Sequence, residues 1–188
     1  MSWTEAAAAA ITLISVYLSA RQNIWSWPTA IVNVGLYTFV FFATGLYSDM
    51  GLQVVYLVLS VYGWYEWLHG GAHRSRLHVS RATPRAWIVS GSIAIVFWIV
   101  WGRYMSTLRG VSLPYIDAGL ATLSLVAQWM MTRKILENWI VWVAVDVVYI
   151  GMFLYKSLVL TAGLYAVFLV LSLMGYFQWR RTLQPAPS

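Results

Sequence analysis

Six long stretches of this chain contain no Asp, Glu, Lys or Arg, and they constrain its fold more than any other feature. Charged residues make up 10% of the 188 residues, whereas soluble globular domains carry roughly 25%. A helix needs about 20 apolar residues to cross a bilayer, so such stretches predict membrane-spanning helices and exclude a soluble domain. They cover residues 6–20, 22–48, 50–65, 86–102, 118–132 and 157–179.

The chain has room for seven spans joined by short loops, which predicts an all-α integral membrane protein with a single transmembrane domain over residues 1–188. The Ala-rich run after residues 1–5 is expected to be the first span rather than a signal peptide, because no basic region precedes it. We expect spans near residues 6–20, 27–43, 50–68, 86–102, 115–132, 137–155 and 158–179.

Basic residues are distributed unevenly between the two sides of the expected bundle. Three of them, Arg103, Arg109 and Lys156, would lie on one side. Because an excess of Lys and Arg marks the cytoplasmic side of a membrane protein, the uneven distribution predicts an outside N-terminus and a cytoplasmic C-terminus. The net charge of +6 therefore reflects topology and not affinity for nucleic acid. The nine basic residues on the other side are Arg21, Arg74, Arg76, Arg81, Arg85, Arg133, Lys134, Arg180 and Arg181.

The two halves of the chain repeat each other at an offset of 112 residues. Without any gap, residues 6–67 and 118–179 share 17 identities. Four spans separate equivalent helices, so the copies would enter the membrane in the same direction, as parallel repeats do in transporters. We predict repeat one at about 6–67, a linker helix at about 86–102 and repeat two at about 115–179. The matches include Arg21 with Arg133, Trp27 with Trp139, Tyr37 with Tyr149, Phe41 with Phe153, Gly51 with Gly163, Ser60 with Ser172, Gly63 with Gly175 and Trp67 with Trp179.

Polar and aromatic side chains share one face of the expected span at 137–155. A carboxylate in the middle of a span costs about 3 kcal/mol or more to insert, so Asp146 should face a cavity or a partner. Alternatively, Asp146 joins helices by hydrogen bonding to Gln128 or Asn33, and the two roles are compatible. At 100° per residue, the residues of this face are Asn138, Trp139, Trp142, Asp146, Tyr149 and Phe153.

Three other spans carry narrower polar stripes. Trp139 and Trp142 share their face with Asp146, so we interpret them as a platform for a flat polar ligand, which can be a cation. Seven tryptophans at expected span ends are instead assigned to the aromatic belts at the membrane interfaces: Trp3, Trp25, Trp27, Trp67, Trp87, Trp101 and Trp179. The stripes are Asp117, Ala121, Ser124 and Gln128; Gln53, Tyr56, Ser60, Trp64 and Trp67; and Asn33 with Tyr37.

Several motifs carry a family resemblance: Asn23-Ile24-Trp25-Ser26-Trp27-Pro28 with Asn33, Gln53 through Tyr62-Gly63-Trp64-Tyr65-Glu66-Trp67, Ala127-Gln128-Trp129-Met130-Met131 with Lys134, Glu137-Asn138-Trp139-Ile140-Val141-Trp142, Val145-Asp146 with Tyr149, Tyr155-Lys156, Leu160-Thr161, and Gly175-Tyr176. They resemble the PnuC-type vitamin transporters, in particular the nicotinamide riboside transporters, over nearly the whole chain except 69–114. The resemblance implies seven spans in two parallel three-helix repeats, similar in plan to the SWEET sugar transporters. It also implies a homotrimer in the lipid of the bacterial inner membrane.

The resemblance further implies facilitated diffusion of nicotinamide riboside for NAD biosynthesis, with trapping by a cytoplasmic kinase and without a cofactor or enzymatic activity. The family's WxxW motif corresponds to Trp139 and Trp142, which would sandwich the nicotinamide ring. The other expected substrate-binding residues are Asn138, Gln128 and Asp146, near the ribose or the ring amide, together with Tyr149, Gln53 and Asn33.

Other functions stay open at this point. Transporters of similar plan carry thiamine or riboflavin, and a membrane receptor or scaffold is a further alternative because binding does not prove translocation. A retinal photoreceptor is excluded, because residues 158–179 contain no lysine. A metalloenzyme is disfavoured, because the chain has no cysteine and its histidines lack the glutamate of an H-E-x-x-H motif. We expect a solvated basic loop around His69, His73 and His78.

Overall fold

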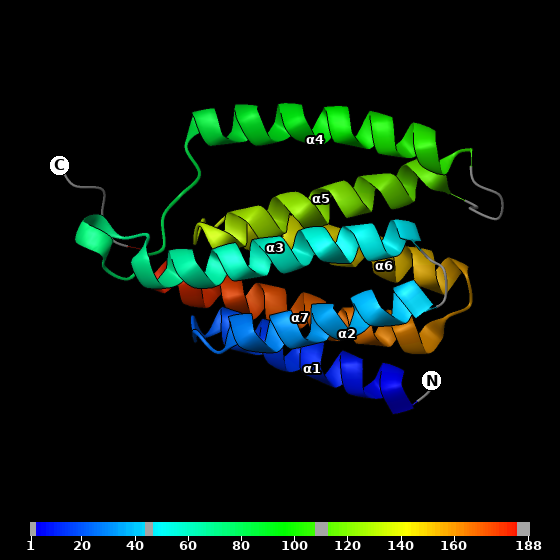
Figure 1. The fold of residues 1–188 in the computed structure, drawn as a ribbon, viewed down its shortest axis with the longest axis horizontal. Coiled ribbons are helices and arrows are strands. Elements are labelled where there is room, and N and C mark those ends of the chain that lie inside the picture. The colour runs from blue at the N-terminus through cyan, green and yellow to red at the C-terminus, as the bar shows by residue number, and fades with distance from the viewer. Residues whose placement is uncertain (1–2, 44–46, 108–112, 184–188) are drawn as a thin grey trace.

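The computed structural model describes residues 3–43, 47–107 and 113–183, most of which are α-helical. Each expected span lies on one helix, and the ends differ by no more than three residues. Arg109 and the side chains of Trp3 and Phe41 lie outside the described part. The helices are α1 (Trp3–Ala20), α2 (Ser26–Ala43), α3 (Tyr47–His69), α4 (Pro84–Met105), α5 (Pro114–Thr132), α6 (Asn138–Tyr155) and α7 (Val159–Arg181), with a short 3-10 turn at Ala72–Arg74 (Figure 1).

Three of the described helices, α4, α6 and α7, are by themselves long and apolar enough to cross a membrane. Ala7–Ala20 of α1 forms a shorter apolar helix. Polar residues such as Gln53 in α3 and Gln128 in α5 lower the hydropathy of the other helices. Such residues are tolerated in a bilayer when they face the interior of a bundle instead of lipid.

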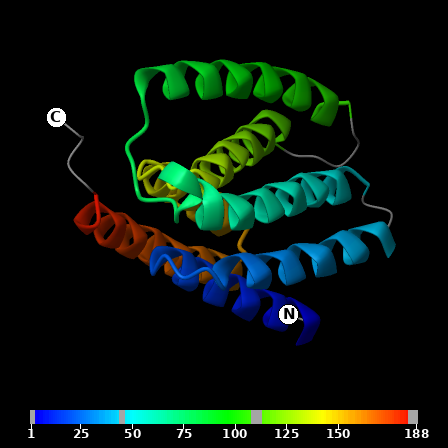
Figure 2. The ribbon, with the colours of Figure 1, turned by 60° about the vertical axis from the view of Figure 1, so that its left-hand side comes forward.

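The helices pack as two groups of three, with α4 at the edge. Consecutive helices are in contact within α1–α3 and within α5–α7, and the groups meet where α1 packs on α7 and α3 packs on α5. The helix α4 packs on α5, and Figures 1 and 2 show it as an outer layer. The helix α1 begins and α7 ends at opposite ends of the bundle (Figure 1).

The turns after α1 and α5 have the same conformation, although they lie 112 residues apart. Gln22 and Lys134 both adopt left-handed backbone angles, with φ of 54° and 48°, which is uncommon for residues other than glycine. The next residue in each turn donates its backbone N–H to a carbonyl five residues earlier: Asn23 to Leu18 at 2.8 Å, and Ile135 to Met130 at 3.0 Å.

Each three-helix group also contains a tryptophan pressed against a glycine. A Cβ added to Gly175 would lie 2.5–2.7 Å from three ring carbons of Trp139, and one added to Gly63 would overlap the ring of Trp27. Glycine therefore allows α7 to approach α6, and α3 to approach α2, as small residues do in membrane bundles.

Four tryptophans cluster in the core near one end of the bundle, where Trp67 of the first group meets Trp179 of the second. Trp27 meets Trp67 edge-on with ring centroids 5.2 Å apart, and Trp139 meets Trp179 in the same way at 5.4 Å. Trp27, Trp67 and Trp179 are only 2%, 3% and 0% exposed. The assignment of these three to an interfacial belt is therefore wrong: they fill the contact between helices, whereas Trp25 and Trp87 are exposed.

Candidate functional site

A cavity of about 470 Å³ lies between the two three-helix groups. Side chains from α1, α2, α3, α5, α6 and α7 line it, and no described residue of α4 does. Its volume is in the range of about 300–1,000 Å³ that is common for small-molecule sites. The place where the groups meet therefore holds the candidate site.

Seven of the eight residues proposed from the sequence to bind substrate line this cavity. Asn138 does not, although it shares a helix face with several of them. It is fully buried at the start of α6, where its Nδ2 donates to the carbonyl of Ile135 at 2.6 Å. Asn138 therefore holds the turn before α6. The seven lining residues are Asn33, Gln53, Gln128, Trp139, Trp142, Asp146 and Tyr149.

Asp146 is 4% exposed and lies on the cavity wall. Its Oδ2 accepts a hydrogen bond from Ser172 Oγ of α7 at 3.0 Å. The helix-joining partner of Asp146 is thus Ser172, instead of the expected Gln128 or Asn33; the amide of Asn33 donates to Thr12 Oγ1 at 2.8 Å. Among the described lining residues Asp146 is the one carboxylate, and none is Lys, Arg or His.

The structure adds lining residues that the sequence analysis did not propose as ligands. Ser26, Trp27 and Ser60 each have a buried polar atom without a partner among the described residues. Buried polar groups are normally hydrogen-bonded, so these atoms mark polar parts of the wall that local packing leaves unsatisfied. Ser60 belongs to a polar stripe that periodicity reveals in the sequence, and Ser172 is the residue that matches it at the 112-residue offset. Tyr165 and Phe168 of α7 belong to no polar or aromatic stripe recognised in the sequence. In the structure their rings continue the aromatic part of the wall that begins at Tyr149.

Residues 2–181 match the sequence pattern of the family described as nicotinamide mononucleotide transporter. The chain belongs to this family. It is 24% identical to the nicotinamide riboside transporter PnuC of Escherichia coli K12, over 95% of this chain and 85% of that protein. It is 26% identical to the riboflavin/roseoflavin transporter RibM of Streptomyces davaonensis, over 94% of this chain and 84% of RibM.

A solved structure has the same fold. This chain matches the crystal structure of the vitamin B3 transporter PnuC with a TM-score of 0.72 at 24% sequence identity. The match covers 96% of this chain and 82% of the PnuC chain. Members of the nicotinamide mononucleotide transporter family are transporters and not enzymes. The long apolar helices and the family together make this chain a multi-pass membrane transporter.

The two tryptophans of the WxxW motif have different surroundings in this family member. Trp139 is 1% exposed, lies against Gly175 and meets Trp179 edge-on. Trp142, one turn later on α6, is half-buried on the cavity wall. Trp142 is therefore the more accessible of the two rings for a ligand to stack on, whereas Trp139 is almost completely covered by its protein neighbours.

We expect alanine to act differently at these two positions. Trp142→Ala should weaken binding of an aromatic ligand by about 1–3 kcal/mol through the lost aromatic contact, with little change in melting temperature. Trp139→Ala should destabilise the fold by about 3–5 kcal/mol, because it empties a packed site. Calorimetric titration and thermal unfolding of both purified variants test this. Unchanged affinity in Trp142→Ala would remove that residue from the ligand platform.

Proposed function

We propose that this protein carries nicotinamide riboside across the membrane by facilitated diffusion. The observation that carries the proposal is the charge of the cavity wall, which combines one carboxylate with aromatic rings, amides and hydroxyls. A pyridinium ring gains energy from aromatic faces and from a nearby carboxylate, and ribose hydroxyls can bond to the amides. The riboside transporters of Escherichia coli and Neisseria mucosa, which align with 95% and 97% of this chain, support the same substrate.

The same wall argues against a mononucleotide as the substrate, despite the description of the family. A phosphate group adds about −1.5 to −2 charges at neutral pH. The described lining offers no Lys, Arg or His to pair with it, and an unpaired charge away from water is costly. The cavity therefore favours the riboside over its phosphorylated form.

In this proposal each part of the ligand meets a different set of side chains. Asp146 lies near the positive charge of the pyridinium ring, and Trp142 stacks on the ring, with Trp139 forming the inner wall beside it. Asn138 acts indirectly by holding the start of α6. The remaining residues face the ribose and the ring amide: Gln128, Tyr149, Gln53 and Asn33.

We propose that the two three-helix groups are parallel repeats related by a twofold axis along the membrane normal, in the SWEET-like plan, with α4 as the linker. The contacts that recur at the 112-residue offset support this arrangement: the paired turns at Gln22 and Lys134 and the paired tryptophan–glycine contacts. Transport would then proceed by rocking of one group against the other around the cavity.

The cellular setting is part of the same proposal. The nine-to-three division of basic residues supports an N-terminus outside and a C-terminus in the cytoplasm. The relatives from Escherichia coli and Neisseria mucosa support the bacterial inner membrane as the location. Facilitated diffusion only equilibrates a substrate, so net uptake requires its consumption. A cytoplasmic kinase would consume the riboside by phosphorylating it. The product would then be retained in the cell, because the phosphorylated form does not suit the cavity. The exposed apolar residues of α4 are available to lipid or to the neighbouring protomers of a homotrimer.

Uptake into liposomes tests the proposed function. We expect saturable uptake of nicotinamide riboside that needs no ion gradient and is not competed by nicotinamide mononucleotide. Empty liposomes serve as the control. If riboside binds but does not enter, the receptor alternative gains support, and if the mononucleotide enters equally well, the charge argument is wrong.

Riboflavin is the second candidate substrate, because the riboflavin/roseoflavin transporter RibM is 26% identical to this chain over 94% of its length. Its ring system is uncharged, so Asp146 would contribute only a hydrogen bond. Competition by riboflavin and by thiamine, an aromatic cation, in the same liposomes separates these substrates. Riboflavin uptake without riboside uptake would keep the transporter and replace its substrate.

A further inference from the structure

Two tryptophans from opposite groups, Trp67 and Trp179, meet near one end of the bundle. This end carries Arg21, Arg133, Lys134, Arg180 and Arg181 and is here called the basic end. We propose that Trp67 and Trp179 are gate residues, and that opening the cavity toward the basic end breaks one hydrogen bond from each indole to the opposite group. This inference rests on the proposed transport function, since a permanent wall would need no gate.

The two indoles make reciprocal hydrogen bonds across the contact between the groups. Trp67 Nε1 of α3 donates to the carbonyl of Met131 in α5 at 3.0 Å, and Trp179 Nε1 of α7 donates to the carbonyl of Ser19 in α1 at 3.1 Å. Donors and acceptors are each 112 residues apart. Ser19 and Met131 line the cavity, whereas the two tryptophans do not. The indoles therefore lie behind the cavity wall, with their ring centroids 5.8 Å apart.

The other symmetric pair of tryptophans behaves differently. Trp27 and Trp139 pack against glycines of their own groups, and their Nε1 atoms have no partner among the described residues. Such packing makes each group rigid without linking it to the other. Trp67 and Trp179 supply the linking bonds, so a rocking motion that preserves both groups would break their bonds and leave the glycine contacts intact.

The acceptor carbonyls keep a partner when the indoles leave. The backbone N–H of Gln22 donates to the Ser19 carbonyl at 2.9 Å, and that of Lys134 donates to the Met131 carbonyl at 3.1 Å. Because an unpaired buried polar group is costly, this second bond lowers the cost of opening. The freed indole N–H groups can bond to water that enters from the basic end.

Gln22 and Lys134, which match each other at the 112-residue offset, are in contact at the basic end. Lys134 Nζ donates to Gln22 Oε1 at 3.3 Å and sits 4.5 Å from the ring centroid of Trp67. Residues at equivalent positions can touch only near the axis that relates the groups. Burial, and to a smaller extent the positive charge of Arg76, lowers the pKa of Lys134 from 10.5 to about 8. A partly desolvated ammonium group thus lies at the contact between the two groups.

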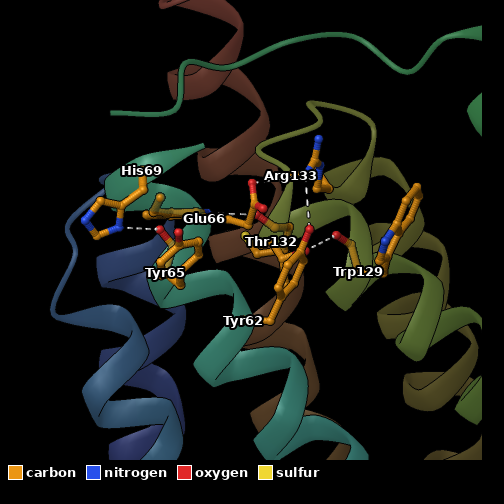
Figure 3. A network of polar contacts seen from close by, with 9 residues as sticks. Tyr62, Tyr65, Glu66, His69, Trp129, Thr132 and Arg133 are labelled. Atoms are coloured by element: carbon orange, nitrogen blue, oxygen red, sulfur yellow. Dashed lines mark hydrogen bonds and ion pairs between the residues drawn. The ribbon is translucent and has the colours of Figure 1, made fainter. Parts of the chain in front are cut away.

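The two contacts between the groups are not equally charged. Between α3 and α5, Arg133 pairs with Glu66 at 3.0 Å and donates to the hydroxyl of Tyr62 at 3.0 Å (Figure 3). The equivalents at the contact between α1 and α7 are Arg21, Gln178 and Met174, which include no carboxylate. The α3–α5 side is therefore held by a charged pair, whereas the α1–α7 side carries a neutral hydrogen bond from Gln22 Nε2 to Thr182 Oγ1 at 2.9 Å. We expect the α1–α7 side to separate further.

The absence of cysteine from the chain allows a direct test of the gate. A Ser60→Cys reporter places one thiol on the cavity wall, and a membrane-impermeant maleimide is added from one side of vesicles at a time. The variants Trp67→Phe and Trp179→Phe retain a ring but remove the indole donor. We expect labelling from the basic end to rise about tenfold in the double variant and less in each single variant. Labelling from the other end should not rise.

Trp98→Phe is the matched control. Trp98 Nε1 donates to the carbonyl of Tyr115 at 2.7 Å between α4 and α5, which is the same kind of bond away from the cavity. Its loss should leave labelling unchanged. The gate is overturned if the folded single variants label no faster from the basic end, or if labelling rises equally from both ends, as general loosening would cause. The readout needs no substrate, so failure of the gate differs from failure of riboside uptake.

Discussion

The Asp146→Asn variant is expected to bind nicotinamide riboside about 10–100-fold more weakly while binding the uncharged dihydro form of the riboside as before. The substitution removes one negative charge and retains a side-chain oxygen that can accept from Ser172, whose hydroxyl lies 3.0 Å from Asp146. Two unit charges about 4 Å apart attract each other by about 1 kcal/mol in water and about 4 kcal/mol near a protein surface, and the expected effect lies in this range. Calorimetric titration with both ligands measures it.

Asp117→Asn is the matched control for this prediction. Asp117 is half-buried in the first turn of α5 and does not line the cavity, so its neutralisation should leave both affinities unchanged. Equal weakening of both ligands by Asp146→Asn would show that the carboxylate acts through hydrogen bonding and not through charge. Unchanged affinity for the cation would place Asp146 away from the pyridinium ring.

Gly175→Ala is expected to lower the stability of the protein by about 1–3 kcal/mol, as overpacking of a close contact does. The new Cβ would lie 2.5–2.7 Å from the ring of Trp139, so either the ring or helix α7 must move. Because Trp139 lines the cavity, riboside affinity should fall as well. Thermal unfolding and titration of the purified variant measure the two effects.

Gly163, which lies in the same helix α7, provides the matched control variant. A Cβ on Gly163 would meet nothing within 4 Å, so Gly163→Ala should be neutral or stabilising by up to about 1 kcal/mol through helix propensity. The equivalent pair in the first group is Gly63 and Gly51, and Gly51 is likewise open. Similar melting temperatures for Gly175→Ala and Gly163→Ala would contradict the assigned tryptophan–glycine contact.

The helices and the polar and aromatic faces that contribute to the cavity wall follow from the sequence alone. Uncharged stretches must be helical in a bilayer, because only a helix or a closed barrel satisfies every backbone group there. Helical periodicity then places Trp142, Asp146 and Tyr149 on one face, and all three line the cavity. The 112-residue offset likewise identified the pairs of glycine and tryptophan that occupy matching places in the two groups.

Which neighbour covers each of those faces depends instead on how the helices pack. Periodicity places Asn138 on the same face as Trp142, but the turn before α6 takes its side chain away from the cavity. Position near a span end suggested an interfacial belt for Trp67 and Trp179, yet helices from the opposite group bury both and accept their indole hydrogen bonds. A helix specifies the direction of its own side chains, whereas burial and bonding depend on backbones far away in the sequence, which come close only when the two groups pack.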